Sequence, residues 1–565
     1  MLKASGKRIL RITLLSFIGL IVLLVVYLKI VATIPPPEDV HADLKKITPV
    51  ERGTNFLTYK DNWIKESNTG LWEMYVEGTP FKRGVIAGQL SKRLLRKQEE
   101  VFVAKIEQLV PSEFYRNFLR VFIGYFNRNI NRHIPGEYLR EIYGISLSAS
   151  SEFNNYGSPY MRILNYHAAH DIGHALKDYA LVGCTSFSAW NHHTPDASII
   201  TGRNFDFYVG ESFAEDKMVQ FVSPEQGHDF GFITWGGMIG VVSGMNMEGL
   251  TVTLNAAKSE LPTSAATPIT IVAREILQYA SNIDQAIQIA SKRETFVSEA
   301  IMVSSAKDGK TVIIEKSPHK QALVKPQEDR IICSNHFRND IFYEDSAALE
   351  KYRSANSLYR FRRVKELMVD HDALTPSVAS QILRNRKGLN GKKIGMGNEK
   401  AINQLIAHHS VIFKPEERLM WVSTNPYNLG RYVAYDLKEV FRTHKGLKEK
   451  KEIYEEHLMI AADSFLYSGG YQDYLQYKQL KRKIRQRIEN EANDSNISTE
   501  QLEAFKASNL EYFETYQILG DYYRSMGDYQ EAFTHYRQAL NKEIPRKKIR
   551  KQIRERLHEC KAHVK

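Results

Sequence analysis

The stretch that decides the fold reads Gly183-Cys184-Thr185-Ser186-Phe187-Ser188-Ala189-Trp190. A glycine directly precedes the thiol, and the alternating run that follows is typical of a β-strand. Glycine adopts backbone geometries that are closed to other residues, so a strained peptide between Gly183 and Cys184 is open to attack by the thiol. A self-cleavage point is one interpretation of this pattern; from Gly-Cys alone, a buried structural cysteine on an edge strand is the favoured one.

Cleavage at this point would leave Cys184 as the first residue of a new chain, with a free α-amine. That amine has a reference pKa of roughly 7.7–8, against roughly 8.5 for a free thiol. It can therefore serve as the general base for its own thiol, and no histidine is required. On this interpretation Cys184 is the nucleophile of an acyl-transfer reaction.

A second motif ends the next β-rich run and reads Gly202-Arg203-Asn204-Phe205-Asp206-Phe207. A hairpin from residue 184 to residue 206 would bring Arg203 and Asp206 beside the new N-terminus. An arginine in that position favours the thiolate over the thiol, and an aspartate can hold the α-amine. A strand-end ion pair is the alternative interpretation of these two residues.

The motifs together resemble the N-terminal-nucleophile (Ntn) cysteine hydrolases, which include choloylglycine (bile salt) hydrolases, acid ceramidase-like enzymes and the penicillin acyltransferase family. The likeness is greatest to the last, the acyl-coenzyme A:aminopenicillanic acid acyltransferase-like proteins, and it covers about residues 70–430. Besides the two motifs above, it rests on Gly244-Met245-Asn246-Met247-Glu248-Gly249-Leu250 and Leu254-Asn255. The opening of the family's pro-region is similar to Leu71-Trp72-Glu73, Gly78-Thr79-Pro80 and Arg83-Gly84. These motifs are specific in combination and not singly.

The resemblance implies a role for each member of a set of site residues. It implies cleavage after Gly183, Cys184 as the nucleophile, and Arg203 and Asp206 as its two electrostatic partners. Asn255 and Asn335, the latter within Ser334-Asn335-His336, resemble the asparagines of the oxyanion hole. The distal arginine of the family resembles Arg360 in Leu358-Tyr359-Arg360-Phe361, with Arg362 and Arg363 close by.

The fold implied by the resemblance is α+β, a four-layer αββα sandwich with two antiparallel sheets between helical layers. The sequence pattern agrees in part: residues 38–183 have helical periodicity, whereas residues 184–441 contain short β-rich runs and a hairpin signal at Asp308-Gly309. Between these runs we expect one helical stretch over residues 268–290, with Thr267 as its N-cap. We therefore expect a helical pro-region over residues 35–183 and a catalytic domain over residues 184–445.

The N-terminal part, residues 1–34, is expected to be a cytoplasmic basic tip and a membrane anchor. Residues 12–28 carry no charge and would extend about 26 Å as a helix, marginally enough for a bilayer core. A cleaved signal peptide is the alternative. Basic residues at the start predict a single-pass protein whose bulk lies on the non-cytoplasmic side.

Residues 446–565 are expected to be helical, with one tetratricopeptide-like repeat over residues 513–540. An ordinary helical hairpin is the alternative, and a protein partner at this region is left open.

The net charge of +12 does not indicate nucleic acid, because five cations lie in residues 1–29 and the last helix is basic. Cys560 is expected to be an exposed thiol on this basic tail, and Cys333 a core residue.

The expected reaction is acyl transfer through a thioester on Cys184, which cleaves or forms an N-acyl amide bond without a cofactor. The substrate would be a small-molecule or lipid-like N-acyl amide, with acyl-coenzyme A as acyl donor if the enzyme is a transferase. His170 and His174 have metal-ligand spacing, but a third ligand is missing, so we expect no metal. His408-His409-Ser410 receives no catalytic role. A non-catalytic envelope scaffold that acts through its C-terminal region is the rival hypothesis.

Overall fold

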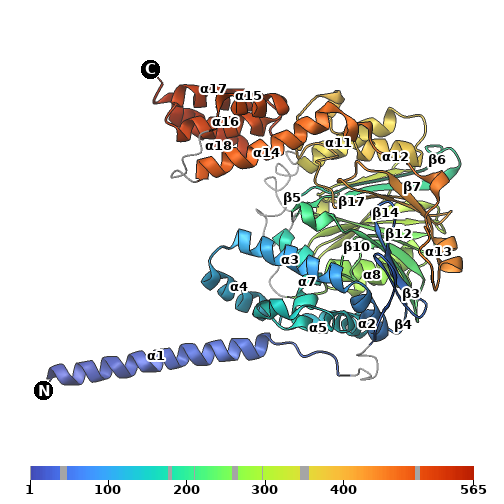
Figure 1. The fold of residues 1–565 in the computed structure, drawn as a ribbon, viewed down its shortest axis with the longest axis horizontal. Helices are drawn as coiled ribbons and strands as arrows, with labels where there is room; N and C mark the ends of the chain where they lie inside the picture. The colour runs from blue at the N-terminus through green and yellow to red at the C-terminus, as the bar shows by residue number, and fades with distance from the viewer. Residues whose placement is uncertain are drawn as a thin grey trace.

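Two stacked β-sheets lie at the centre of the protein, and helices cover the outer face of each (Figure 1). This computed structural model describes residues 2–38, 47–175, 181–208, 210–257, 265–295, 297–343, 356–489 and 497–564. In these residues the larger sheet has 11 strands and the smaller sheet has 6. A further ladder of 2 strands pairs β5 (Leu181–Val182) with β8 (Phe207–Tyr208).

The larger sheet takes its strands from both sides of Cys184 in the sequence. Their order in the sheet follows their order in the chain, except that β4 is followed directly by β9. They are β1 (Val50–Gly53), β2 (Phe56–Tyr59), β3 (Asn62–Glu66), β4 (Trp72–Gly78), β9 (Met218–Pro224), β10 (Phe230–Thr234), β11 (Ser243–Asn246), β12 (Leu250–Ala256), β13 (Glu299–Ser305), β14 (Lys310–Lys316) and β15 (Gln321–Val324).

The smaller sheet has the order β16-β6-β7-β17-β18-β19, and all its neighbours are antiparallel. Its strands are β6 (Thr185–Asn191), β7 (Ala197–Phe205), β16 (Arg330–Cys333), β17 (His409–Lys414), β18 (Leu419–Ser423) and β19 (Tyr432–Asp436). Strand β6 begins one residue after Cys184, so the candidate nucleophile lies at the end of a central strand.

Apolar side chains on the facing sides of the sheets hold the sandwich together. Phe221 of the larger sheet belongs to one buried cluster with Phe413 and Val422 of the smaller sheet. Apolar side chains that point inward from both sheets form the core of such a two-sheet sandwich. The outer face of the larger sheet packs on α2 (Pro80–Leu90), α6 (Gly136–Ser146), α7 (Pro159–Ala175), α8 (Ile269–Tyr279) and α9 (Ile283–Lys292).

The outer face of the smaller sheet packs on α11 (Asn356–Val369) and α12 (Pro376–Leu383) through a further apolar cluster. The layers therefore follow the order helix, sheet, sheet, helix, and the mixed α+β class is confirmed. One detail of the prediction is wrong: the sheets are not wholly antiparallel, because β4 and β9 run parallel over seven register pairs.

The prediction that residues 35–183 form a helical segment is also wrong in part. Strands β1 to β4 occupy its beginning, and β4 lies inside the larger sheet between β3 and β9. Charged residues hid the strand pattern: Lys65 of β3 and Glu73 of β4 are both buried and form an ion pair of 2.5 Å. The later part is helical as expected, with α3 (Lys92–Leu109), α4 (Glu113–Phe126) and α5 (Ile130–His133) as its further helices.

The single helix expected over residues 268–290 is two helices, α8 and α9. The chain leaves the first at Ala280, whose backbone is extended, and Asn282 caps the second by accepting a hydrogen bond from the backbone N–H of Gln285. The expected N-cap is one residue too early, because Pro268 occupies that position. The Thr267 hydroxyl instead donates to the backbone oxygen of His133.

The N-terminal helix α1 (Leu2–Ala32) extends away from the body of the protein (Figure 1). Within the part of the chain that is described, no helix combines the length and the apolar character needed to span a bilayer. The anchor expected over residues 1–34 is therefore not supported, and the location of the chain stays a prediction.

The C-terminal region is helical, as predicted, and consists of α14 (Gly469–Glu489), α15 (Thr499–Ser508), α16 (Phe513–Ser525), α17 (Tyr529–Leu540) and α18 (Lys547–Lys561). Helices α16 and α17 form the expected hairpin, which packs on α14; the Tyr477 hydroxyl donates to Glu514 over 3.1 Å. That this hairpin is a tetratricopeptide repeat stays a prediction. The expectation for Cys560 is wrong, since the apolar core of this region buries it completely.

Candidate active site

The Gly183–Cys184 peptide lies between two antiparallel ladders. Before it, Val182 pairs with Phe207 in the β5–β8 ladder. After it, Thr185 pairs with Asn204 in the β6–β7 ladder, and this is the predicted hairpin. The backbone N–H of Gly183 donates to the carbonyl oxygen of Asp206 over 3.1 Å. The peptide is therefore fixed directly opposite the Arg-Asn-Phe-Asp motif.

Arg203 reaches the thiol from the neighbouring strand. Its Nη2 lies 3.7 Å from Cys184 Sγ and also donates to the carbonyl oxygen of Leu254. Its Nη1 donates to Ser243 Oγ over 2.5 Å and lies 3.3 Å from His409 Nε2. These contacts hold both Nη atoms of the guanidinium, and the residue has no exposed surface.

Burial dominates the electrostatics of the site. It raises the pKa of the Cys184 thiol to about 11, although the charge of Arg203 acts in the opposite direction. Burial likewise raises the pKa of Asp206 to about 7, against the lowering effects of Arg360 and Arg203. In the uncut chain the thiol is thus protonated at neutral pH, and a base must remove its proton before it attacks.

The carboxylate of Asp206 is held on one side only. Its Oδ2 accepts a hydrogen bond of 3.2 Å from the side-chain amide of Gln404. Its Oδ1 is buried and has no hydrogen-bond partner in the described part of the chain. Buried polar atoms are normally paired, so this oxygen has capacity for one more donor close to the Gly183–Cys184 peptide.

Asn255 comes from β12 of the other sheet and contacts Ser186, two residues after Cys184. Its Oδ1 accepts a hydrogen bond of 2.7 Å from Ser186 Oγ, and its Nδ2 donates to the carbonyl oxygen of Cys333 over 3.3 Å. Both contacts join the two sheets at the start of β6. The amide lies close to the candidate nucleophile, but these hydrogen bonds go to residues other than Cys184.

Asn335 and Arg360 form one connected group that contacts the start of β6 at Thr185. Asn335 Oδ1 accepts a hydrogen bond of 2.6 Å from Arg360 Nη2, and its Nδ2 donates to the carbonyl oxygen of Ala256 over 2.9 Å. Arg360 also donates from Nε to the hydroxyl of Thr185 over 3.3 Å. Arg360 itself is the arginine that reaches the site, whereas Arg363 contacts Asn385 and Glu366.

Sequence reasoning missed three residues of this site. Gln404 donates from Nε2 to the carbonyl oxygen of Gly183 over 3.0 Å, across 221 positions of sequence. Ser243 and His409 contact each other over 2.9 Å and support Arg203. The doublet His408-His409 was the one available signal, and it received no role. Burial lowers the pKa of His409 well below its usual value, so its imidazole is neutral and supports Arg203 without added charge.

The described residues contain no group of three or more potential metal ligands. The side chains of His170 and His174, whose spacing was considered for a metal, lie outside the described residues. The described site offers a thiol, a carboxyl, and amide and guanidinium donors.

Comparisons with known proteins agree with the motifs. Residues 192–425 match the model of a family described as acyl-coenzyme A:6-aminopenicillanic acid acyl-transferase. The matched segment includes the predicted site residues from Arg203 to Arg360 and begins after Cys184. An uncharacterized protein of Archaeoglobus fulgidus is 21% identical over 344 residues, which are 54% of this chain. The chain spans 56% of the length of that curated relative.

Solved structures give more distant matches. An N-acylethanolamine-hydrolyzing acid amidase ortholog of Caenorhabditis elegans is 17% identical, with a TM-score of 0.31, over 41% of this chain and 93% of its own. Penicillin V acylase from Agrobacterium tumefaciens is 17% identical, with a TM-score of 0.30, over 45% and 87%. A conjugated bile acid hydrolase mutant from Clostridium perfringens is 12% identical, with a TM-score of 0.31, over 48% and 96%.

Residues 192–425 are thus similar to the acyl-coenzyme A:6-aminopenicillanic acid acyl-transferase family, and this confirms the resemblance that the sequence motifs indicated.

Proposed function

We propose that the protein is an Ntn acyl-transfer enzyme that cuts its own chain between Gly183 and Cys184 and then uses Cys184 as its nucleophile. The observation that carries the proposal is the convergence on one peptide. Arg203 lies 3.7 Å from the thiol, and the backbone of Asp206 accepts the Gly183 N–H. An ordinary buried cysteine would need neither a buried guanidinium nor a buried carboxyl beside it, since both are costly to desolvate.

Self-cleavage would begin with attack of Cys184 Sγ on the carbonyl carbon of Gly183. The thiol proton passes to the peptide nitrogen, the C–N bond breaks, and a thioester of Gly183 on Sγ forms with a free α-amine. Water then hydrolyses the thioester and leaves a Gly183 carboxylate and the Cys184 thiol. The unpartnered Oδ1 of Asp206 supports this sequence, because it can accept a hydrogen bond from the new amine.

In turnover, the α-amine would take the thiol proton and the thiolate would attack the amide carbonyl of the substrate. The amine returns the proton to the leaving nitrogen, and a second acceptor, water or an amine, takes the acyl group from the thioester. A general base is needed because the thiolate, and not the thiol, is the nucleophile. Asn255 and Asn335 are the donors that we assign to the oxyanion.

The substrate class that we propose is an N-acyl amide with an apolar acyl chain. Its support is a group of aromatic rings next to Arg203: Phe205 stacks on Phe207 at 5.7 Å, and Phe213 lies 5.0 Å from Trp235. All four belong to the same buried apolar cluster as Cys184. Buried apolar surroundings of this kind favour an apolar acyl group over a charged one.

The test is the mass of the purified chain together with its activity on a library of N-acyl amides. We expect two fragments, one beginning at Cys184, and a substrate-derived acyl group on that fragment in a rapidly quenched reaction. Cys184→Ala should stay whole and take up no acyl group. An active enzyme with an intact Gly183–Cys184 bond would contradict the α-amine mechanism, and a whole, inactive wild type would favour the scaffold.

A further inference from the structure

The carbonyl oxygen of Gly183 already accepts a side-chain hydrogen bond in the uncut chain. Gln404 Nε2 donates to it over 3.0 Å and to Asp206 Oδ2 over 3.2 Å. Both partners are acceptors, so the amide nitrogen and not the amide oxygen of Gln404 must face them. Gln404 is buried, and its amide bridges the carbonyl that self-cleavage would attack and the carboxylate that would hold the new amine.

We propose that Gln404 is a catalytic residue of self-cleavage and that the C-terminal helical region keeps it in place; the proposal rests on the self-cleavage proposed above. Attack by Cys184 Sγ converts the Gly183 carbonyl oxygen into an oxyanion, which a donor already within 3.0 Å stabilises without rearrangement. When the C–N bond breaks, the negative charge leaves this oxygen as the thioester carbonyl reforms.

The loop segment that carries Gln404 is held on the active-site side by hydrogen bonds to Asn204 and Asn385. Asn204, the second residue of the Arg-Asn-Phe-Asp motif, donates to the carbonyl oxygen of Ile402 over 3.2 Å. The backbone N–H of Asn403 donates to the carbonyl oxygen of Asn385 over 2.9 Å. These contacts give Asn204 a function in the motif, since it holds the backbone two residues before Gln404.

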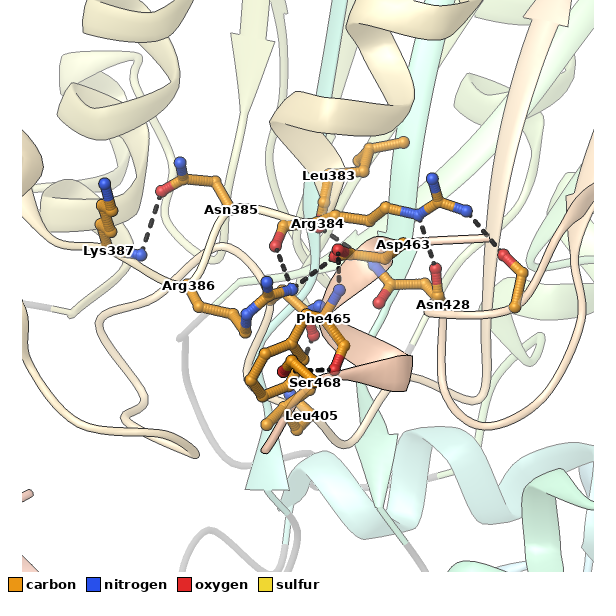
Figure 2. A network of polar contacts seen from close by, with 12 residues as sticks. Leu383, Arg384, Asn385, Arg386, Lys387, Leu405, Asn428, Asp463, Phe465 and Ser468 are labelled. Atoms are coloured by element: carbon orange, nitrogen blue, oxygen red, sulfur yellow. Dashed lines mark hydrogen bonds and ion pairs between the residues drawn. The ribbon is translucent and has the colours of Figure 1, made fainter. Parts of the chain in front are cut away.

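Leu405 turns the same segment towards the C-terminal region. Its φ of 55° is in the left-handed region, which a branched side chain rarely adopts unless its surroundings hold it there. The side chain is buried in the apolar core of the C-terminal helices, together with Tyr471 and Phe505. Figure 2 shows Leu405 beside Phe465, close to the ion pair of 2.6 Å between Arg386 and Asp463. Neighbouring residues 404 and 405 thus connect the scissile peptide to the C-terminal region.

Two ion pairs, formed by Glu399 and Lys400 a few residues before Gln404, strengthen this connection. Lys400 pairs with Glu543 over 2.6 Å, and Glu399 pairs with Arg546 over 2.8 Å. On the other side, the carbonyl oxygen of Glu399 accepts a hydrogen bond of 2.8 Å from Arg360. The segment is therefore held between the active site and residues of the C-terminal region, which gives that region an internal role.

The test follows cleavage of freshly purified precursor by intact mass, with melting temperature measured in parallel. Gln404→Met removes the donor, and we expect cleavage of the folded precursor to slow about 100-fold, the scale of one lost oxyanion donor. Gln404→Glu keeps the side-chain volume, and its carboxyl donates only while protonated. Its cleavage rate relative to wild type should therefore rise as pH falls. The charged and titratable residues around the peptide, Cys184, Arg203, Asp206 and Arg360, are present in both proteins.

Cleavage of Gln404→Met at the wild-type rate would overturn the proposal, and so would a pH-independent ratio for Gln404→Glu. The second variant decides alone if the first does not fold. A wild type that stays whole would instead refute self-cleavage itself. For the C-terminal region, Leu405→Ala should slow cleavage several-fold, whereas Leu519→Ala, equally buried in the same core, should not. Equal rates for these two variants and wild type would remove the role of that region.

Discussion

The guanidinium of Arg203 and the thiol of Cys184 lie 3.7 Å apart, and each is buried. The other branch of the guanidinium is held by Ser243 over 2.5 Å. The planar fork of arginine is suited to such contacts in several directions at once, whereas a lysine ammonium is a single point of charge on a flexible stem. The arrangement therefore depends on arginine and not only on a positive charge.

Arg203→Lys should lower turnover per folded molecule by about 100-fold, on the scale of one strong electrostatic partner. Asp206→Asn should cost about as much, and the double variant little more, because both residues act through Cys184. The measurement is specific activity together with melting temperature. Arg442→Lys, on an exposed ion pair, is the matched control and should be unaffected. Lower melting temperatures with unchanged turnover would assign both residues a purely structural role.

Asp206 should also make the stability of the folded protein depend on pH, because its pKa differs between the folded and unfolded states. Its pKa rises from 3.8 to about 7 on folding because of burial. Between these values the unfolded chain has released the proton and the folded chain retains it, so the folded state loses stability as pH rises from about 4 to about 7. Above about 7 both states are ionised and the contribution of Asp206 no longer changes.

The uncut Cys184→Ala protein with and without Asp206→Asn isolates this contribution. The advantage in melting temperature of the aspartate protein over its asparagine counterpart should shrink as pH rises from about 4 to about 7. A difference between the two that stays constant over this range would show that Asp206 is already ionised at the low end.

The sequence was a good guide to the strands that carry the motifs. The strand expected directly after Cys184 is β6, and the Asp308-Gly309 turn joins β13 to β14. Strands β3 and β4 were missed because both of their faces are covered. In such strands the buried Lys65–Glu73 pair interrupts the apolar pattern. The signal of alternation applies only where one face meets water.

Much of the predicted site does meet at one place, because Arg203 and Asp206 follow the nucleophile on the adjacent strand of a hairpin. Local pairing of this kind can be inferred from spacing. Gln404 could not be found in this way, since it is 221 positions from Gly183 and approaches from a loop without regular periodicity. Its function depends on which loop the tertiary fold brings to the peptide, and one sequence does not encode that in a local pattern.

The two fragments left by self-cleavage should remain associated. Strand β4 of the first fragment pairs with β9 of the second over seven positions, from Trp72 with Met218 to Gly78 with Pro224. Removing β4 would open the larger sheet and expose its apolar faces to water. On size exclusion the cut protein should elute as one species at the mass of the whole chain, and the fragments should separate only in denaturant. Separation of the fragments in native buffer would contradict this arrangement.

A buried ion triad also joins the two fragments. Glu141 of the first fragment pairs with Arg83 over 2.5 Å and with Arg274 of the second over 3.4 Å. Glu141→Gln leaves two buried guanidiniums without a counter-charge, which should lower the free energy of unfolding by about 3–5 kcal/mol. Urea unfolding measures this. Glu100→Gln, on the exposed pair with Arg96, should cost less than about 1 kcal/mol, and a similar loss for both would contradict the prediction.

Gly183→Ala should prevent self-cleavage for a steric reason that precedes any chemistry. A Cβ atom at residue 183 would lie 1.9 Å from Nε2 of Gln404, so the amide would have to leave the position from which it donates to the Gly183 carbonyl. The donor is displaced while the attacking thiol, Arg203 and Asp206 are all retained. Cleavage followed by intact mass should therefore be at least about 100-fold slower, on the scale of a lost oxyanion donor.

Gly53→Ala is the matched control, because a Cβ there meets no atom within 4 Å, and it should cleave as wild type does. The double variant Gly183→Ala with Gln404→Ala removes the clash but not the loss of the donor, and should stay slow. Rapid cleavage in this double variant would mean that the alanine blocks the reaction only through its clash with Gln404 and that the Gln404 donor is dispensable.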